Sequence, residues 1–133
     1  MDPYTNHELI EKAKTVLKPR TLPSGDVVCD VACALVSASG KIYLGVCFSA
    51  GSDGHCAEVA AIAAMITAGE TSIAQIVAVW GEDTVLPPCG RCREFMYQVD
   101  KTNLTNTDVV LGASSTVKLK ELLPHPYDEV WQS

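Results

Sequence analysis

The sequence predicts a single α/β domain built on a mixed β-sheet with helices on both faces. After an opening hairpin, β-rich segments alternate with helical ones, and this order favours crossover helices that cover both faces of a sheet. The segment 56–68 is apolar around nearly its whole circumference, which is typical of a helix buried against a sheet. With 133 residues, the chain 1–133 is long enough to bury one core and fits one domain.

The first half of the chain should contain a helix, a hairpin and a loop. The expected elements are a helix over 6–17, strands over 27–36 and 41–48, and a small-residue loop over 49–54. Pro19 ends the helix, and Ser39-Gly40 forms the hairpin turn. The small side chains of the loop suit the lining of a pocket.

The second half should alternate helices with strands. The expected elements are helices over 56–68 and 89–99, strands over 73–80, 107–111 and 116–119, and a helical turn over 121–123. Gly69 stops the first of these helices, and two prolines lead into the second.

The composition is that of an ordinary globular protein, and it excludes several classes of partner. Hydrophobic residues make up 47% of the chain and charged residues 20%. The formal net charge of −6 argues against binding nucleic acid, which requires basic patches that neutralise phosphates. No apolar run approaches the ~18 residues of a membrane span, so we expect no membrane partner and a cytoplasmic location. In that reducing compartment the six cysteines would serve as three metal ligands and three free thiols, and the sequon at Asn103 would carry no glycan.

Three cysteines and a glutamate stand at spacings that suit a catalytic zinc site. Cys89 and Cys92 form a C-x-x-C pair behind a proline, and Cys56 would supply a third sulfur. Glu58 follows Cys56 by two residues, near enough to approach an open coordination position without binding the metal. Because structural zinc sites have four protein ligands and only three stand out here, the pattern predicts an open, catalytic site. His55 is the alternative fourth ligand of a closed, structural site.

At these residues the chain resembles the cytidine deaminase superfamily of zinc aminohydrolases. The resemblance extends over about residues 25–131 and rests on C-x-E at 56–58, P-C-x-x-C at 88–92 and Glu-Leu-Leu-Pro at 121–124, in the order typical of that family. The Gly-Arg between the paired cysteines and the ending Tyr127…Trp131 are most similar to the blasticidin S deaminase branch and to the small tetrameric cytidine deaminases.

The resemblance implies a three-layer α/β/α sandwich with a mixed five-stranded sheet, one Zn²⁺ per subunit and a homotetramer. It implies a hydrolase acting on C–N bonds of cyclic amidines. The small-molecule substrate would be a cytosine nucleoside, or a nucleoside antibiotic similar to blasticidin S, whose 4-amino group is released as ammonia. Cys56, Cys89 and Cys92 carry over as metal ligands, and Glu58 carries over as the catalytic residue that moves protons.

The charge of the predicted centre calls for a compensating cation. The helices that begin near Cys56 and Cys89 would point their N-termini at the metal and stabilise thiolates. Three thiolates overcompensate the charge of Zn²⁺, and the arginine that follows the glutamate in many relatives is Val59 here. We therefore expect Arg91, between the paired cysteines, to offset the excess negative charge, with Arg93 behind it.

Substrate contacts are predicted where the chain departs from these relatives. In deaminases of free nucleosides an asparagine and a glutamate hold the ribose, whereas Cys47 and Ser49 stand at the matching positions here, and Cys29 stands where the family has an aromatic residue over the base. The acidic residues Asp30, Asp53 and Glu82 would favour a cationic substrate. The candidate substrate-binding residues are Asp30, Cys47, Ser49, His55, Tyr127 and Trp131, the last two closing the pocket of their own or of a neighbouring subunit.

Other functions stay open at this point. The activity could be that of a cytidine or deoxycytidine deaminase of pyrimidine salvage, or the chain could be a catalytically inactive, zinc-stabilised binding protein. The intact Glu58 argues against the inactive protein. A thiol-redox protein that uses Cys89 and Cys92 is a third class, and it would be isolated without metal and with an oxidisable pair.

Overall fold

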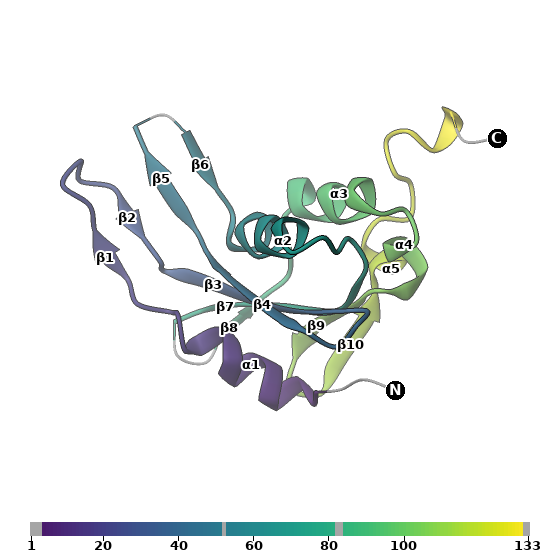
Figure 1. Ribbon diagram of the computed structural model, residues 1–133, viewed down its shortest axis with the longest axis horizontal. Coiled ribbons are helices and arrows are strands. Elements are labelled where there is room, and N and C mark those ends of the chain that lie inside the picture. The colour runs from purple at the N-terminus through teal and green to yellow at the C-terminus, as the bar shows by residue number, and fades with distance from the viewer. Residues whose placement is uncertain (1–3, 52, 82–83, 132–133) are drawn as a thin grey trace.

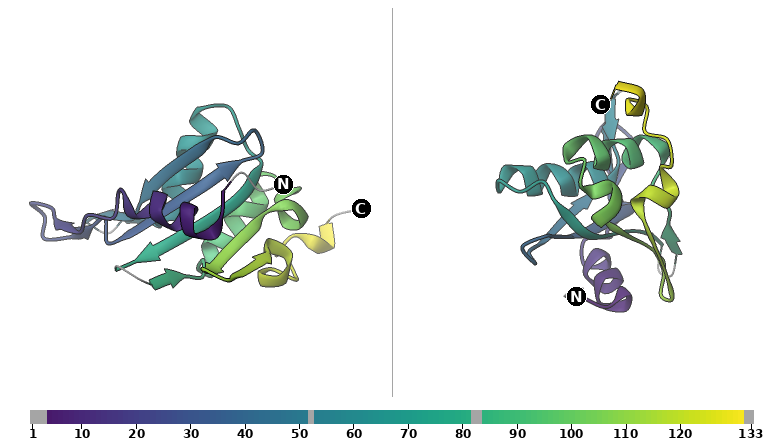
Figure 2. Two further views of the ribbon diagram at one scale, coloured as in Figure 1. Left: turned by 90° about the horizontal axis from the view of Figure 1, so that it is seen from below. Right: turned by 90° about the vertical axis from the view of Figure 1, so that its right-hand side faces the viewer.

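The structure is a computed structural model that describes residues 4–51, 53–81 and 84–131. A twisted β-sheet forms the middle layer, with α1 (Asn6–Lys14) on one face and α2 (Ala57–Thr67) and α3 (Gly90–Val99) on the other (Figure 1 and Figure 2). The predicted α/β sandwich with helices on both faces is confirmed.

The sheet is mixed. Its path runs β10 (Ser115–Lys118), β9 (Asp108–Gly112), β7 (Ile73–Trp80), β3 (Val31–Ser37) and β4 (Ile42–Val46). The β7–β9 pair is parallel, and the other pairs along this path are antiparallel. The path has the five strands expected from the sequence, and within the described ranges a short sixth strand, β8 (Thr84–Leu86), pairs with the end of β7.

Smaller elements surround this sheet. They are the hairpin strands β1 (Arg20–Thr21) and β2 (Val27–Val28), a second pair β5 (Phe48–Ala50) and β6 (Asp53–His55), the short helices α4 (Asn103–Asn106) and α5 (Leu119–Leu122), and a 3₁₀ turn at Glu129–Trp131. The two hairpins project from the same end of the molecule, and the C-terminal turn lies at the opposite end beyond α3 (Figure 1).

The side chains of strand β3 pack in two hydrophobic clusters, one on each face of the sheet. Its side chains alternate between the two faces of the sheet, as the period of a strand requires. Cys33 and Leu35 pack in the cluster that includes α2 and α3, whereas Ala32, Ala34 and Val36 pack in the cluster that includes α1. All five are fully buried, so both faces of this central strand are covered.

The structure corrects three boundaries. The first helix ends at Lys14, because Val16 and Leu17 bond to carbonyls three residues back and so form a turn. The predicted strand 27–36 is broken between β2 and β3, where Cys29 has a φ of 64°. The predicted loop 49–54 forms most of the β5–β6 hairpin.

The buried side chain of Asn103 hydrogen-bonds to the backbone of two separate segments near the end of α3. Its side chain accepts from the Ile73 N–H at 2.9 Å and donates to the carbonyls of Thr71 and Met96 at 3.1 and 2.9 Å. The residue is 0% exposed. Buried polar groups must be hydrogen-bonded, and Asn103 satisfies three backbone groups from two separate segments, which fixes the end of α3 beside β7.

Strand β4 and helix α2 approach each other closely at Gly45. A Cβ at this position would lie 2.6 Å from the carbonyl oxygen of Ala57 and 2.9 Å from the carbonyl carbon of Ala60, both backbone atoms of α2. The absence of a side chain therefore sets the distance between the sheet and the helix that carries Glu58.

Within the described ranges, no helix is long and apolar enough to span a membrane.

We predict that Gly45→Ala destabilises the protein by about 1–3 kcal/mol, because the added methyl group forces the backbone of α2 away from β4. Denaturant unfolding monitored by circular dichroism measures this change. Gly112→Ala in β9 is the matched control, since a Cβ there meets no atom within 4 Å, and it should leave the unfolding midpoint nearly unchanged. Equal midpoints for the two variants would contradict the close-approach argument.

Candidate metal centre

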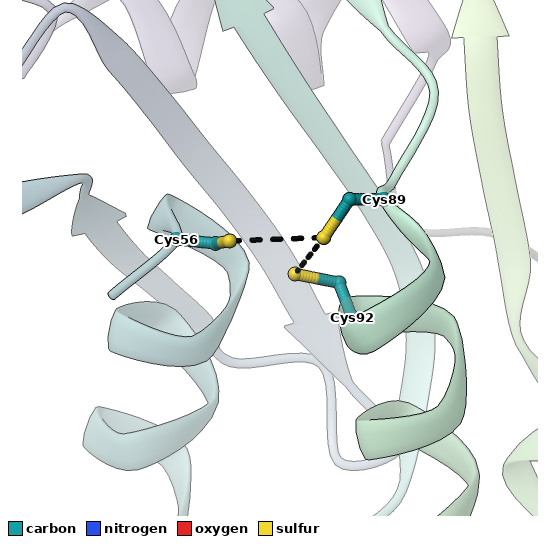
Figure 3. A group of neighbouring side chains, drawn as sticks. All are labelled: Cys56, Cys89 and Cys92. Carbon is teal, nitrogen blue, oxygen red and sulfur yellow. Dashed lines mark hydrogen bonds between the residues drawn. The ribbon is translucent and has the colours of Figure 1, made fainter. Parts of the chain in front are cut away.

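Three sulfur atoms converge where α2 and α3 begin. Cys56 is the residue that caps the N-terminus of α2, Cys89 caps α3, and Cys92 lies in the first turn of α3. The Sγ atoms of Cys56 and Cys89 are 3.7 Å apart, and those of Cys89 and Cys92 are 3.5 Å apart. Figure 3 shows the three side chains pointing toward one another across the gap between the two helices.

This arrangement fits a zinc ion. A Zn–S bond is about 2.3 Å long, so two sulfurs on a tetrahedral ion lie about 3.8 Å apart. The observed separations are close to that value, and all three sulfurs lie within 4.8 Å of one another. Among the described residues, this group of possible ligands contains Cys56, Cys89 and Cys92 alone. Three protein ligands leave a coordination position for water, as in catalytic zinc sites.

Burial and neighbouring groups shift the pKa values of the three thiols in different directions. Burial raises the pKa of Cys56, and burial together with the charge of Glu58 raises the pKa of Cys92 well above its usual range. Burial also opposes ionisation of Cys89, but the backbone N–H of Cys92 and the neighbouring thiols outweigh it and lower the pKa of Cys89. A bound divalent cation is what makes three such sulfurs thiolates together, because metal ligation requires their deprotonation.

Glu58 lies in the first turn of α2 and is 6% exposed. It shares a cavity of about 180 Å³ with Cys56 and Cys89. Burial raises the pKa of the Glu58 carboxyl, although its own backbone N–H and the Cys92 thiol oppose part of this effect. A carboxyl group that binds a proton more readily than usual, inside a cavity, suits proton transfer to a substrate.

The remaining walls of the cavity are mostly apolar. They consist of Val31, Cys47, Ala57, Leu86 and Pro87. The sequence pattern did not single out Val31, Leu86 or Pro87. The proline pair before Cys89 was an available signal for Pro87, since it lies on the segment that enters the metal site. Such walls suit the two faces of a planar heterocycle.

Arg91 and His55 contact each other at the rim of the centre. The guanidinium of Arg91 lies 3.4 Å from Nδ1 of His55 and donates to the carbonyl oxygen of Gly54 at 3.5 Å. The ring of His55 also packs on Phe48, with the centroids 5.1 Å apart. His55 therefore belongs to a contact between the β5–β6 hairpin and α3, and it is not in the group of possible metal ligands.

Arg93 binds backbone on both sides of the site, and its expected share in charge compensation stays a prediction. Its Nε donates to the carbonyl oxygen of Pro88 at 2.8 Å, and one of its terminal nitrogens donates to that of Leu122 at 3.2 Å. These bonds tie the segment that precedes Cys89 to the end of α5. Arg93 thus holds the backbone that presents two of the three sulfurs.

The structure brings some of the predicted substrate residues to the cavity and leaves others away from it. Cys47 lines the cavity, and its thiol donates to Asp30 at 2.8 Å. Ser49, in β5, is half-buried and is not part of the lining. Tyr127 and Trp131 pack edge to face at 5.4 Å, are 64% and 71% exposed, and do not line the cavity of their own chain. Asp53 is exposed in β6, and Glu82 lies outside the described residues.

Comparison with known proteins agrees with this geometry. Residues 4–106 match the family model described as "Cytidine and deoxycytidylate deaminase zinc-binding region". The chain is similar to the cytidine deaminase of Burkholderia pseudomallei, with 30% sequence identity and a TM-score of 0.75 over 93% of this chain and 100% of that one. The cytidine deaminase of Mycobacterium tuberculosis has 23% identity and a TM-score of 0.76 over 91% of this chain and 95% of that one. The cytidine deaminase of Bacillus anthracis has 19% identity and a TM-score of 0.72 over 95% of this chain and 91% of that one.

The family match covers well over half of the chain, and the three cysteines suit one Zn²⁺ per subunit. The predicted superfamily is confirmed, whereas the narrower likeness to blasticidin S deaminase stays a prediction. Membership of this kind supports a hydrolase that acts on C–N bonds and a cytidine deaminase activity. The chain therefore belongs to the cytidine and deoxycytidylate deaminase family of zinc-binding domains.

Proposed function

We propose that this protein is a zinc-dependent aminohydrolase that removes the 4-amino group of a cytosine nucleoside, yielding the uracil form and ammonia. The observation that carries the proposal is that the buried carboxyl group of Glu58 lines the same cavity of about 180 Å³ as Cys56 and Cys89, two of the three clustered cysteines. A structural zinc site needs no such carboxyl group and leaves no open position. A redox pair would need only Cys89 and Cys92, and it would not explain the third sulfur from α2.

The residues of the chain divide the work of hydrolysis. Cys56, Cys89 and Cys92 would hold Zn²⁺, which when bound supplies a Lewis acid that makes water a nucleophile near neutral pH. Glu58 accepts a proton from the attacking water and delivers it to the ring nitrogen next to the carbon that carries the amine. It next takes a second proton, from the hydroxyl group now on that carbon, and passes it to the amine as the C–N bond breaks, so that ammonia leaves and the new C=O bond forms. The buried position of Glu58 and its raised pKa favour these two successive proton transfers.

Arg91 is proposed as the cation that offsets the excess negative charge of the three thiolates. Its guanidinium contacts Gly54 and His55, the two residues before Cys56, while its backbone lies between Cys89 and Cys92 in α3. The residue thus links the two segments that carry the sulfurs. A cation there also stabilises the thiolates through the field that it creates.

The substrate is proposed to be a cytosine nucleoside or a nucleoside antibiotic similar to blasticidin S. Solved structures of similar chains are cytidine deaminases, which supports cytidine or deoxycytidine. The antibiotic is supported by the residues that differ from the ribose-binding pattern, Cys47 and Ser49. Release of ammonia from cytidine, deoxycytidine and blasticidin S, followed by ultraviolet absorbance, separates these substrates. Activity with none of them would favour the zinc-stabilised binding protein.

We further propose a homotetramer in the cytoplasm. The face of α2 that includes Ala63, Ala64 and Ile66 is exposed and carries no charged group, which suits contact with another subunit. The C-terminal pair Tyr127 and Trp131 is also exposed, and it would close the cavity of a neighbouring subunit. None of the six cysteines forms a disulfide in the described ranges, which suits a reducing compartment.

We predict that Glu58→Gln retains the fold and the zinc but lowers kcat by about 10²–10⁴-fold or more, because the amide cannot carry the proton. Circular dichroism and zinc analysis by atomic absorption are measured beside ammonia release. Turnover at the wild-type rate would remove Glu58 from the mechanism.

Arg91→Ala is expected to weaken zinc affinity or kcat/KM by about 10–100-fold, the usual effect of losing a group that supports metal ligands. Competition with a chromogenic chelator measures the affinity. Arg91→Lys keeps the charge but not the planar guanidinium, and it should be affected less if charge compensation is the main role. Unchanged zinc affinity and turnover in Arg91→Ala would contradict that role.

The double variant Tyr127→Ala/Trp131→Ala should raise KM by about two- to tenfold, since the substrate loses an aromatic cover. If the tail closes a neighbouring site, coexpression with Glu58→Gln restores a wild-type KM, because an intact tail then meets an intact Glu58 in the other subunit. A KM that stays raised in the mixed assembly would place the tail over its own site.

A further inference from the structure

The strand pair β3–β4 is distorted beside the cavity. The N–H of Cys29 donates to the carbonyl oxygen of Cys47 at 2.9 Å, while the N–H of Cys47 donates to the carbonyl oxygen of Val31 at 3.0 Å. Cys29, Asp30 and Val31 therefore all lie opposite Cys47. The left-handed φ of 64° at Cys29 turns the chain between β2 and β3, which follow each other in Figure 1. Bulges of this kind re-aim a side chain and are common next to active sites.

The side chain that is re-aimed is Asp30. Its Oδ1 accepts the thiol hydrogen of Cys47 at 2.8 Å. The same sulfur accepts the N–H of Val31 at 3.3 Å, so the thiol is held from both sides. Burial, and then the hydrogen bond to Asp30, raise the pKa of Cys47, which keeps the thiol protonated and able to donate. Cys47 thus fixes the orientation of the Asp30 carboxylate.

Asp30 stands one hydrogen bond away from the catalytic cavity. Cys47 lines that cavity together with Glu58 and Cys56, and Asp30 is half-buried behind it, partly open to solvent. Among the described residues, none of the ion pairs includes Asp30, and its Oδ2 has no hydrogen-bond donor. A half-buried carboxylate without a cation beside it can accept a hydrogen bond from a cationic group of a ligand.

The size of the cavity indicates which part of a substrate reaches Asp30. At about 180 Å³ it is smaller than the roughly 300–1,000 Å³ of pockets that enclose a whole ligand. The ring that carries the amine must lie against Glu58 and the sulfurs. The rest of the substrate therefore extends out of the cavity. Asp30 is not part of the lining, but its contact with Cys47 and its partial exposure place a carboxylate beside that lining.

We infer that Asp30, oriented by Cys47, is a specificity-determining residue that favours substrates with a cationic amine or guanidine group outside the reacting ring. The inference rests on the proposed deaminase function. A cation is favoured over a hydroxyl group because it adds Coulomb attraction to the hydrogen bond that either group donates to the carboxylate. The net charge of −6 acts in the same direction by attracting cations.

Cytidine and 5′-amino-5′-deoxycytidine form a matched pair of substrates for the test, since they differ in one neutral or cationic group. The zinc-loaded wild type should prefer the amino compound by about tenfold or more in kcat/KM, carried by KM. Asp30→Asn keeps the shape of the side chain and removes its charge. This variant should lose the preference, so that its kcat/KM values for the two compounds become nearly equal.

Cys47 is tested as the positioning residue. Cys47→Ser retains a donor to Asp30 and should retain most of the preference, whereas Cys47→Ala removes the donor and should lower it. Calorimetric binding of the products, 5′-amino-5′-deoxyuridine and uridine, measures the same preference without turnover. Unfolding midpoints of all variants identify any that are merely destabilised.

The outcomes separate the two proposals. If the wild type and Asp30→Asn discriminate the pair equally, in turnover or in product binding, the role of Asp30 is overturned while the deaminase function stands. The role of Asp30 is overturned in the same way if Asp30→Asn lowers kcat/KM for both compounds by the same factor. If the wild type deaminates neither compound, the proposed function fails for these substrates, and product binding alone then decides the role of Asp30. If neither product binds, the role of Asp30 is overturned as well.

Discussion

The mutual approach of two helix N-termini is the constraint on which the rest of the molecule depends. Cys56 and Cys89 are 33 residues apart in the chain, yet their sulfurs lie 3.7 Å from each other. That contact exists because α2 packs on β4 without a side chain at Gly45, and because Arg93 ties the segment before α3 to α5. The backbone N–H of Cys92, in the first turn of α3, favours negative charge on the Cys89 sulfur. The scaffold therefore brings the three sulfurs together before any metal arrives, and the bound cation makes them thiolates together.

The local sequence was enough to predict the elements with long, unambiguous patterns. The apolar run of β7 was predicted with its observed bounds, Ile73–Trp80, because a buried strand must be apolar on both faces. The cysteine triad was also predictable, since zinc ligands occur at characteristic spacings. These features depend on short stretches of chain, and tertiary contacts do not alter them.

Features that depend on long-range pairing were not predictable in the same way. The β5–β6 hairpin consists largely of small residues whose strand character comes only from their pairing, and β8 is a three-residue strand at an edge. Nothing in the run of β-forming residues around Cys29 marks a left-handed residue, because non-glycine residues seldom adopt that conformation. The contact of Asp30 with Cys47 follows from that break, and so it was visible only in three dimensions.

The burial of Asn103 has a practical consequence for producing the protein. Asn103-Leu104-Thr105 is an acceptor sequence for N-linked oligosaccharides, but the Asn103 amide is enclosed and bonded to three backbone groups. A sugar attached to the growing chain in a secretory pathway would occupy the space that α3, α4 and β7 require. Expression hosts that route the chain through a glycosylating organelle are therefore a poor choice, whereas hosts that lack that machinery leave this site unmodified.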